Sequence, residues 1–305
     1  MKAFPKLKSK AILAPMIGIT DIAFRALSKK YGAGLTYTGL TSSTALVRNK
    51  KNVSRLTIEK KIKPVAVQLF GSEIDDIVSS AIAIEKYFDI IDINCGCPAT
   101  NIIKAGSGAM LMKDPEKIAK IINRLVSSIK KPVTIKIRAG FTPNKYNAIE
   151  IAKLAEDAGA SAIAIHGRTK NCGYREPANW NIIRDVKNAV NIPIIGNGDV
   201  TTPEVFKQRL EQSGVDYIML GRGAMKNPYL FTQVNNFLKK GHYNEKNKLE
   251  IIKEYIELAE KYKIAYSLIK RNIMQITTGL EAGAILRFKI SKCKSLNELK
   301  ALLEI

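Results

Sequence analysis

Short apolar segments and longer helical patterns alternate along most of this chain, and this alternation restricts the fold more than any other feature. The apolar segments are nearly continuous instead of alternating with polar residues, which is typical of strands covered on both faces. The segments expected to be strands are 11–16, 35–40, 64–70, 89–94, 132–138, 161–167, 192–198 and 215–221. The segments expected to be helices between them are 21–32, 73–87, 115–130, 147–159, 179–190 and 202–214.

Eight strand–helix units of this kind predict an α/β fold, the (β/α)8 TIM barrel. A doubly wound open sheet is the alternative, but no G-x-G-x-x-G follows the first strand, so the barrel is favoured. From about residue 245 the pattern changes to helices alone, at 247–263, 265–279 and 295–305. We therefore expect a barrel domain over residues 1–240, followed by a small C-terminal helical domain over residues 241–305.

The chain of 305 residues carries a formal net charge of +22, and much of this charge lies near its start. Residues 1–63 hold 14 Lys and Arg residues against only Asp21 and Glu59. One explanation is a composition rich in Lys and Ile, whose lysines simply solvate the surface. The other is a surface that attracts phosphate groups, as a nucleic-acid partner would require. Charge alone does not separate the two explanations.

The sequence shows neither a signal peptide nor an apolar run of the roughly 18 residues that cross a membrane, so we expect a cytoplasmic protein. The four cysteines have no framework spacing, which also fits a reducing compartment. Cys95 and Cys97 form a C-x-C without a second pair or a nearby histidine. Because zinc sites need more ligands than this, we expect no metal site.

Barrel enzymes carry their chemistry at the C-terminal ends of the strands. Lys136 lies within VTIKIRAG, a segment that otherwise reads as a buried strand. An unpaired buried ammonium is costly, so Lys136 is expected to face an anion or an electron-rich ligand. An ion pair inside the barrel mouth is the alternative. The polar residues expected at the strand ends are Met16, Gln68, Asn94, Lys136, Arg138, His166, Asn197, Gly221 and Arg222.

Two glycine-containing loops follow the last two expected strands. They are GNGDV (196–200) and GRGAM (221–225), and Arg222 adds a fixed positive charge to the second. Glycines let backbone amides approach a ligand closely, and barrels commonly bind phosphate after strands seven and eight. The sequence therefore predicts a phosphate-bearing cofactor at this side of the barrel.

The loop after the fourth strand is unusually long and begins with CGCPATNIIKAGSGAML (95–111). Long ordered loops in compact domains are usually functional. This one brings a thiol, Lys104 and several glycines to the barrel mouth, where a thiol could act as a nucleophile or as a general acid. We expect Cys95 to be a buried packing residue.

The motifs of this chain resemble those of the tRNA-dihydrouridine synthase family. The resemblance rests on APMIGITDIAFRAL, QLFG, DINCGCP, KAGSGAMLMKDP, KIRAG, HGRTKNCGYREPANW, GNGDV and LGRGAM, which follow one another in the family's order over almost the whole barrel. It implies an FMN-dependent barrel that reduces the C5=C6 bond of uridine in tRNA, with NADPH as reductant. Hydride would pass from reduced FMN to C6, and a proton would reach C5.

The resemblance also assigns roles to particular residues. The family cysteine precedes the proline, so Cys97 is the implied proton donor. The implied cofactor contacts are Pro15, Met16, Ile17, Gln68, Lys136, His166, Asn197, Gly198, Asp199, Gly221 and Arg222. The implied substrate contacts are Asn94, Lys104, Arg138, Arg175 and Arg287, the last of them in the helical domain that grips tRNA in relatives. The basic N-terminal quarter is a further candidate for RNA backbone contacts.

The chain departs from the family pattern at two places. Thr38-Gly39-Leu40 stands where many bacterial relatives have T-E-M, and Asn272 and Gln275 stand where a basic-His and aromatic pair is usual. These departures leave the tRNA orientation and the target uridine open. The sequence also leaves open the choice between NADPH and NADH. A flavin enzyme acting on a free pyrimidine and a non-catalytic RNA-binding protein are the alternative functions. We expect a monomer.

Overall fold

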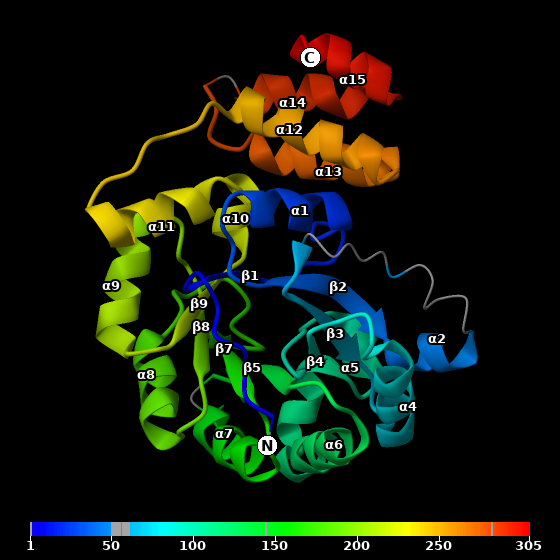
Figure 1. Cartoon of the computed structure of the whole chain (residues 1–305), viewed down its shortest axis with the longest axis vertical. Coiled ribbons are helices and arrows are strands. Elements are labelled where there is room, and N and C mark those ends of the chain that lie inside the picture. Colours follow the sequence, from blue (N-terminus) through cyan, green and yellow to red (C-terminus); the bar gives the residue numbers. More distant parts are fainter. Residues whose placement is uncertain (1, 50–55, 57–61, 144, 282) are drawn as a thin grey trace.

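The computed structural model describes residues 2–49, 56, 62–143, 145–281 and 283–305, and within these ranges eight parallel strands form the barrel (Figure 1). The strands are β1 (Ala11–Leu13), β2 (Thr36–Ser42), β3 (Val65–Phe70), β4 (Ile90–Asn94), β5 (Val133–Thr142), β7 (Ala162–Thr169), β8 (Ile194–Asn197) and β9 (Tyr217–Leu220). Their order is β1-β9-β8-β7-β5-β4-β3-β2. The ring is closed because the Leu13 amide donates to Leu35 O over 2.9 Å and the Gly34 amide donates to Ala11 O over 2.8 Å. The predicted (β/α)8 fold is confirmed.

One strand was not predicted. β5 continues past Arg138 to Thr142, and the two-residue strand β6 (Lys145–Tyr146) pairs with its end in antiparallel fashion. Both residues of β6 are exposed, so they carry none of the apolar signal on which strand prediction depends.

The six helices predicted between strands are all present and surround the barrel in Figure 1. They are α1 (Ile22–Lys30), α4 (Ile74–Ile84), α6 (Pro115–Ser128), α7 (Ala148–Asp157), α8 (Trp180–Ala189) and α9 (Pro203–Ser213). Local chemistry explains their ends: Asp114 and Thr202 cap the amides of α6 and α9, each just before a proline. Gly214 ends α9 at φ 64°, a conformation that favours glycine.

Further helices lie between the strands and after β9. They are α2 (Ser43–Arg48), α5 (Thr100–Lys104), the 3-10 helix η2 (Gly108–Lys113), α10 (Arg222–Lys226) and α11 (Leu230–Lys240). α5 and η2 occupy the long loop after β4, so this loop is an ordered part of the mouth. Inside the ring, Ile12, Tyr37, Ala164 and Met219 belong to a buried cluster distinct from the larger apolar core. This two-sided burial explains the continuous apolar pattern of the strands.

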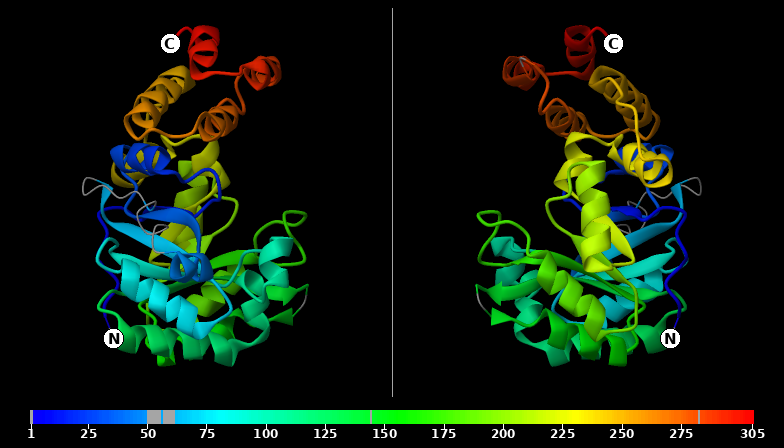
Figure 2. Two further views of the ribbon diagram at one scale, coloured as in Figure 1. Left: turned by 90° about the vertical axis from the view of Figure 1, so that its right-hand side faces the viewer. Right: turned by 90° about the vertical axis from the view of Figure 1, so that its left-hand side faces the viewer.

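The last part of the chain is entirely helical within its described residues. It contains α12 (Lys248–Lys261), α13 (Tyr266–Ile276), α14 (Gly283–Lys292) and α15 (Leu296–Leu303). Three of these match the predicted helices, whereas α14 was not predicted as a helix; its Ile285 and Phe288 are exposed, so it lacks a clear apolar face. Figure 2 shows these helices at one end of the molecule, beyond α1.

A buried polar cluster joins these helices to the barrel. Asn272 of α13 is fully buried, and its Nδ2 lies 2.9 Å from Asp21 Oδ2, 2.8 Å from the Tyr255 hydroxyl and 3.2 Å from Ile19 O. Asp21 in turn caps α1 by accepting the Phe24 amide over 2.8 Å. Asn272 therefore holds the C-terminal helices against the barrel and does not face solvent. None of the described helices is long and apolar enough to cross a membrane.

Candidate active site

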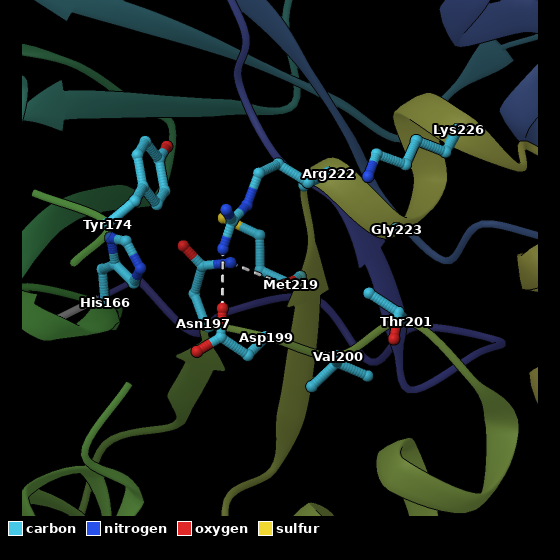
Figure 3. A pocket seen from close by; sticks show the side chains of 12 residues that line it. His166, Tyr174, Asn197, Asp199, Val200, Thr201, Met219, Arg222, Gly223 and Lys226 are labelled. Carbon is cyan, nitrogen blue, oxygen red and sulfur yellow. Dashed lines mark hydrogen bonds and ion pairs between the residues drawn. The ribbon is translucent and has the colours of Figure 1, made fainter. Parts of the chain in front are cut away.

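Two adjoining cavities of about 340 and 270 Å³ open at the C-terminal ends of the strands. They share His166, Tyr174, Asn197, Gly221 and Arg222, so together they form one continuous site. Figure 3 shows the larger cavity, with the side chains of β7, β8 and β9 converging on it. The sequence placed a site at these strand ends, and all the predicted cofactor contacts, together with Asn94, Cys97 and Arg138, line the two cavities.

The larger cavity is lined by glycine-rich turns and by cations. A side chain at position 223 would bring its Cβ to 2.5 Å from Val200 O, so only glycine fits there. Trp180 Nε1 fixes the neighbouring turn by donating to Gly198 O over 3.0 Å. Arg222 and Lys226 add positive charge to the same wall. Close backbone and cations together make this cavity suited to an anionic group such as a phosphate.

Asp199 lines this cavity, and its carboxylate is paired with two arginines. Its φ is 53°, and its carboxylate pairs with Arg168 Nη2 and Arg222 Nη2, both at 2.6 Å (Figure 3 shows the Arg222 pair). Burial alone would raise its pKa, but the Ala178 amide and the two guanidinium groups hold the pKa of Asp199 below its usual value. The Asp199 side chain thus orients Arg222, whose guanidinium also lies 4.1 Å from the centre of the Tyr174 ring.

Lys136 brings a half-buried ammonium to the smaller cavity. Among the described residues, its Nζ donates one hydrogen bond, to Asn197 Oδ1 at 3.2 Å, and Asn197 Nδ2 donates to Met219 O at 2.8 Å. Burial, reinforced by the charge of Arg138 and partly offset by Asp92, lowers the pKa of Lys136 to about 8. Lys136 lines the cavity, and its ammonium has donor capacity beyond this one hydrogen bond.

His166 is surrounded by cations. Burial, followed by the charges of Lys136, Arg138, Arg168 and Arg222, lowers the pKa of His166 to about 2, so the ring is neutral. Arg168 Nη1 lies 3.4 Å from His166 Nε2. Because arginine only donates, this geometry assigns Nε2 as the acceptor and leaves the ring hydrogen on Nδ1.

The two cysteines of the loop after β4, called the cysteine loop below, are in different environments. Cys97 is half-buried and lines the smaller cavity together with Lys136 and His166. Cys95 is fully buried in the apolar core, where burial and the charge of Asp92 raise its pKa. Cys95 is therefore a packing residue, as the sequence indicated, and Cys97 has its thiol at the site.

Hydrogen bonds connect the polar residues at the ends of β3 and β4. Gln68 Nε2 donates to Asp92 Oδ2 over 2.6 Å, and Asn94 Nδ2 donates to Gln68 Oε1 over 2.8 Å. Asn94 Oδ1 accepts the amides of Gly96 at 3.2 Å and Cys97 at 2.9 Å. Asp92 was missed by the sequence analysis, although it lies two residues before Asn94 and therefore on the same face of the strand.

Pro15, Met16 and Ile17 line the smaller cavity after β1, and Ile17 is 61% exposed at its rim. Arg138 also lines it and holds the cysteine loop, because its Nε donates to Gly96 O over 2.7 Å. The predicted contacts of the cofactor therefore lie in one place.

The remaining predicted substrate contacts lie outside these cavities. Lys104 and Arg175 are exposed on α5 and on the loop after β7, and Arg287 of α14 donates to Thr277 O at 3.3 Å among the C-terminal helices. Arg271 of α13 was missed: its guanidinium occupies the space beside Gly18, where an added Cβ would lie only 1.9 Å from Nη1. Arg271 thus brings a cation from α13 to the loop that lines the cavity.

The fold and this site define an α/β-barrel enzyme with a mouth cavity built for an anionic ligand beside a thiol. Residues 12–305 match the family model described as dihydrouridine synthase (Dus), and the chain belongs to this family. It is 38% identical over 292 residues to a probable tRNA-dihydrouridine synthase of Rickettsia conorii, covering 92% of this chain and 88% of the relative. It is 41% identical over 238 residues to tRNA-dihydrouridine synthase B of Vibrio vulnificus, covering 77% and 74% of the two chains.

Two solved structures share the fold at low identity. Histamine dehydrogenase from Rhizobium sp. 4-9 aligns with a TM-score of 0.59 and 13% identity, covering 83% of this chain and 49% of that one. A variant of NCR from Zymomonas mobilis aligns with a TM-score of 0.55 and 16% identity, covering 82% and 91%. These similarities establish the barrel fold alone.

The burial of the thiols predicts a selective reaction. When the native protein is treated with iodoacetamide, we expect Cys97 to be alkylated first, because Cys95, Cys172 and Cys293 are buried. The buried thiols require local opening and should react at least about 10² times more slowly. Peptide mass spectrometry over time measures each site, and faster labelling of Cys172 than of Cys97 would contradict this geometry.

Proposed function

We propose that this protein is a tRNA-dihydrouridine synthase that reduces the C5=C6 bond of a uridine in tRNA, with FMN as cofactor and NADPH or NADH as reductant. The observation that carries the proposal is the thiol of Cys97 lining one cavity with Lys136 and His166, directly beside a glycine-lined anion cavity. Family membership supports the same activity.

The residues present fit FMN. The larger cavity, with Gly223 against Val200 O and with Arg222 in its wall, suits the phosphate end. The smaller cavity would hold the ring, with Met16, Gln68 and Lys136 among its lining residues. When bound and reduced, FMN supplies the hydride that the uracil receives at C6. The charge of Lys136 would favour electron-rich states of the ring, whereas neutral His166 offers only hydrogen bonding.

In this proposal Cys97 donates the proton that C5 requires. Free thiols carry their proton at neutral pH, so a positioned thiol is a competent general acid. The Cys97 amide is held by Asn94 Oδ1, which fixes the loop from which the thiol reaches the cavity. The uracil must leave its stack to enter a cavity of this kind, and loop uridines are the easiest to extract.

For the RNA, we propose that the helical domain, taken as residues 241–305, and the mouth cations share the binding. Lys104, Arg175 and Arg271 lie around the mouth, and their charge would pair with backbone phosphates. The N-terminal lysines lie elsewhere: residues 2–10 pass the N-terminal ends of β7 and β9, where Ser161 Oγ donates to Lys2 O over 2.6 Å and the Ile218 amide donates to Lys10 O over 2.9 Å.

This placement argues against Lys6, Lys8 and Lys10 as contacts for an RNA whose uridine is in the cavity, because they occupy the opposite end of the barrel. Part of the basic N-terminal quarter, including Lys50 and Lys51, lies outside the described residues. The mouth cations therefore replace the N-terminal segment as the proposed phosphate contacts.

The first test separates the two cysteines. Cys97→Ala should bind FMN and be reduced by NADPH like the wild type, but tRNA should then reoxidise the flavin about 10²–10⁴ times more slowly, the usual contribution of a positioned proton donor. Cys95→Ala is the matched control and should be reoxidised normally. Stopped-flow absorbance with unmodified tRNA measures both steps. Normal reoxidation of Cys97→Ala would refute the assignment of Cys97 as the proton donor. If a free pyrimidine but not tRNA reoxidised the flavin of the wild type, tRNA would be refuted as the substrate.

The second test uses the lowered pKa of Lys136. Its ammonium is charged below about pH 8 and neutral above it, so FMN affinity of the flavin-free protein should fall about tenfold between roughly pH 7 and 9. Lys136→Met should bind FMN more weakly at neutral pH and without this dependence. Fluorescence titration of FMN gives the dissociation constants. A wild-type affinity that does not change with pH would exclude Lys136 as the responsible charge.

The third test compares two triple charge reversals. Replacing Lys104, Arg175 and Arg271 by Glu should weaken tRNA binding. It should also lower the slope of log Kd against the logarithm of the salt concentration by about 2–3. Replacing Lys6, Lys8 and Lys10 by Glu changes the net charge equally but should leave the salt dependence near the wild-type value. Equal effects of the two sets would mean that only total charge matters.

A further inference from the structure

A chain of buried polar side chains leads from the barrel interior to the cysteine loop. It begins at Asp92, passes through Gln68 and Asn94, and ends at the amides of Gly96 and Cys97. Asp92 is 0% exposed, Gln68 1% and Asn94 6%, so solvent does not compete for these bonds. The proposed reaction assigns no step to Asp92, and a fully buried carboxylate without a function is costly.

Strand register builds this chain. Gln68 of β3 pairs with Asp92 of β4, and Asp92 pairs with Thr134 of β5, so the three side chains lie side by side inside the ring. The Thr134 hydroxyl donates to Asp92 Oδ1 over 2.6 Å, while Gln68 Nε2 donates to Asp92 Oδ2 over 2.6 Å. Both carboxylate oxygens are therefore occupied by donors.

The two ends of this chain require the same bond directions, since the backbone amides of Gly96 and Cys97 only donate. An ionised carboxylate only accepts, so Gln68 must turn its NH2 group toward Asp92 and its oxygen toward Asn94. Asn94 must then present its NH2 group to Gln68, which leaves its oxygen for the backbone amides of the loop. If the Gln68 amide were reversed, the NH2 group of Asn94 would face the amides of Gly96 and Cys97, and no hydrogen bond could form.

We propose that Asp92 is a positioning residue that fixes the orientation of Gln68 and Asn94 and thereby holds the loop that carries Cys97 in the cavity. The meaning of this role for catalysis rests on the proposed function of Cys97. The position of the loop itself does not depend on that function, because it follows from hydrogen-bond directions alone.

The control by Asp92 depends on whether its carboxyl group is ionised. Burial raises the pKa of Asp92 to about 7, although Thr134, Gln68 and the nearby charge of Lys136 each oppose this rise. A protonated Asp92 carries a donor and no longer forces the direction of the Gln68 amide. The charge of Lys136 thus helps to keep the carboxylate in the form that sets the chain.

The test measures the alkylation rate of Cys97 by iodoacetamide in the full-length protein saturated with FMN. Asp92→Leu removes the acceptor, and Asn94→Ala removes the last link. Each should raise the rate about tenfold, the expected effect of losing the loop's side-chain hydrogen bonds. If Asp92 acts through Asn94, the double variant should also be about tenfold faster, because the second change removes nothing further.

A structural role for Asp92 independent of Asn94 would make the effects multiply to about a hundredfold in the double variant, and this result would overturn the proposal. An unchanged rate in Asp92→Leu would also overturn it. Should Asp92→Leu not fold, Gln68→Met breaks the same chain at its middle link, and the same non-additivity with Asn94→Ala is expected.

Asp89→Leu is the matched control. Asp89 is a carboxylate near the other end of the same strands, where its Oδ2 accepts the Val65 amide over 2.9 Å. Its replacement should lower the melting temperature without changing the alkylation rate of Cys97. If Asp89→Leu instead raised this rate as much as Asp92→Leu does, general destabilisation would explain the effect and the proposal would be overturned. Because no step requires turnover, failure of tRNA to reoxidise the flavin would refute the proposed function without affecting this test.

Discussion

The organisation of this protein depends on one constraint: each barrel strand is covered on both faces, by the interior cluster and by the surrounding helices. Buried polar groups are tolerated only when they are hydrogen-bonded or face a ligand. Along β4 and β5 the buried polar side chains meet this condition in two ways. Asp92 is paired with Thr134 inside the ring and Asn94 with Gln68, whereas Lys136 is bonded to Asn197 and lines the cavity. Within these two strands, a buried cation that is not fully paired thus lies at the mouth, where a ligand can reach it.

The charged side chains around the cavity are predominantly positive. Arg138, Arg168 and Arg222 crowd around Lys136 and His166, and they help to lower the pKa of the histidine. The carboxylate of Asp199 compensates part of this charge by pairing with two of the arginines. A site with this excess of positive charge is preorganised for an anionic ligand, because the cost of bringing the cations together is met in folding and not on binding.

Sequence patterns were sufficient for the barrel and its eight strands, and strand-end position together with the family resemblance indicated most residues that line the two cavities. They were insufficient where a residue's role depends on distant partners. Nothing near Asn272 in sequence indicates that it is buried against Asp21, and nothing near Arg271 indicates that it reaches Gly18. α14 and β6 were missed because both present exposed side chains and little apolar periodicity. Asp92 was within reach of strand alternation, but only the register of β3 and β4 shows what it binds.

The segment between β1 and α1 serves two structures at once. Pro15, Met16 and Ile17 line the cavity, and Asp21, a few residues later, is bonded to Asn272 of the helical domain. Arg271, next to Asn272, touches the same segment at Gly18. The same few residues thus line the cavity and contact the C-terminal helices. A substitution in this short segment would therefore alter the lining of the cavity and the seating of the C-terminal helices together.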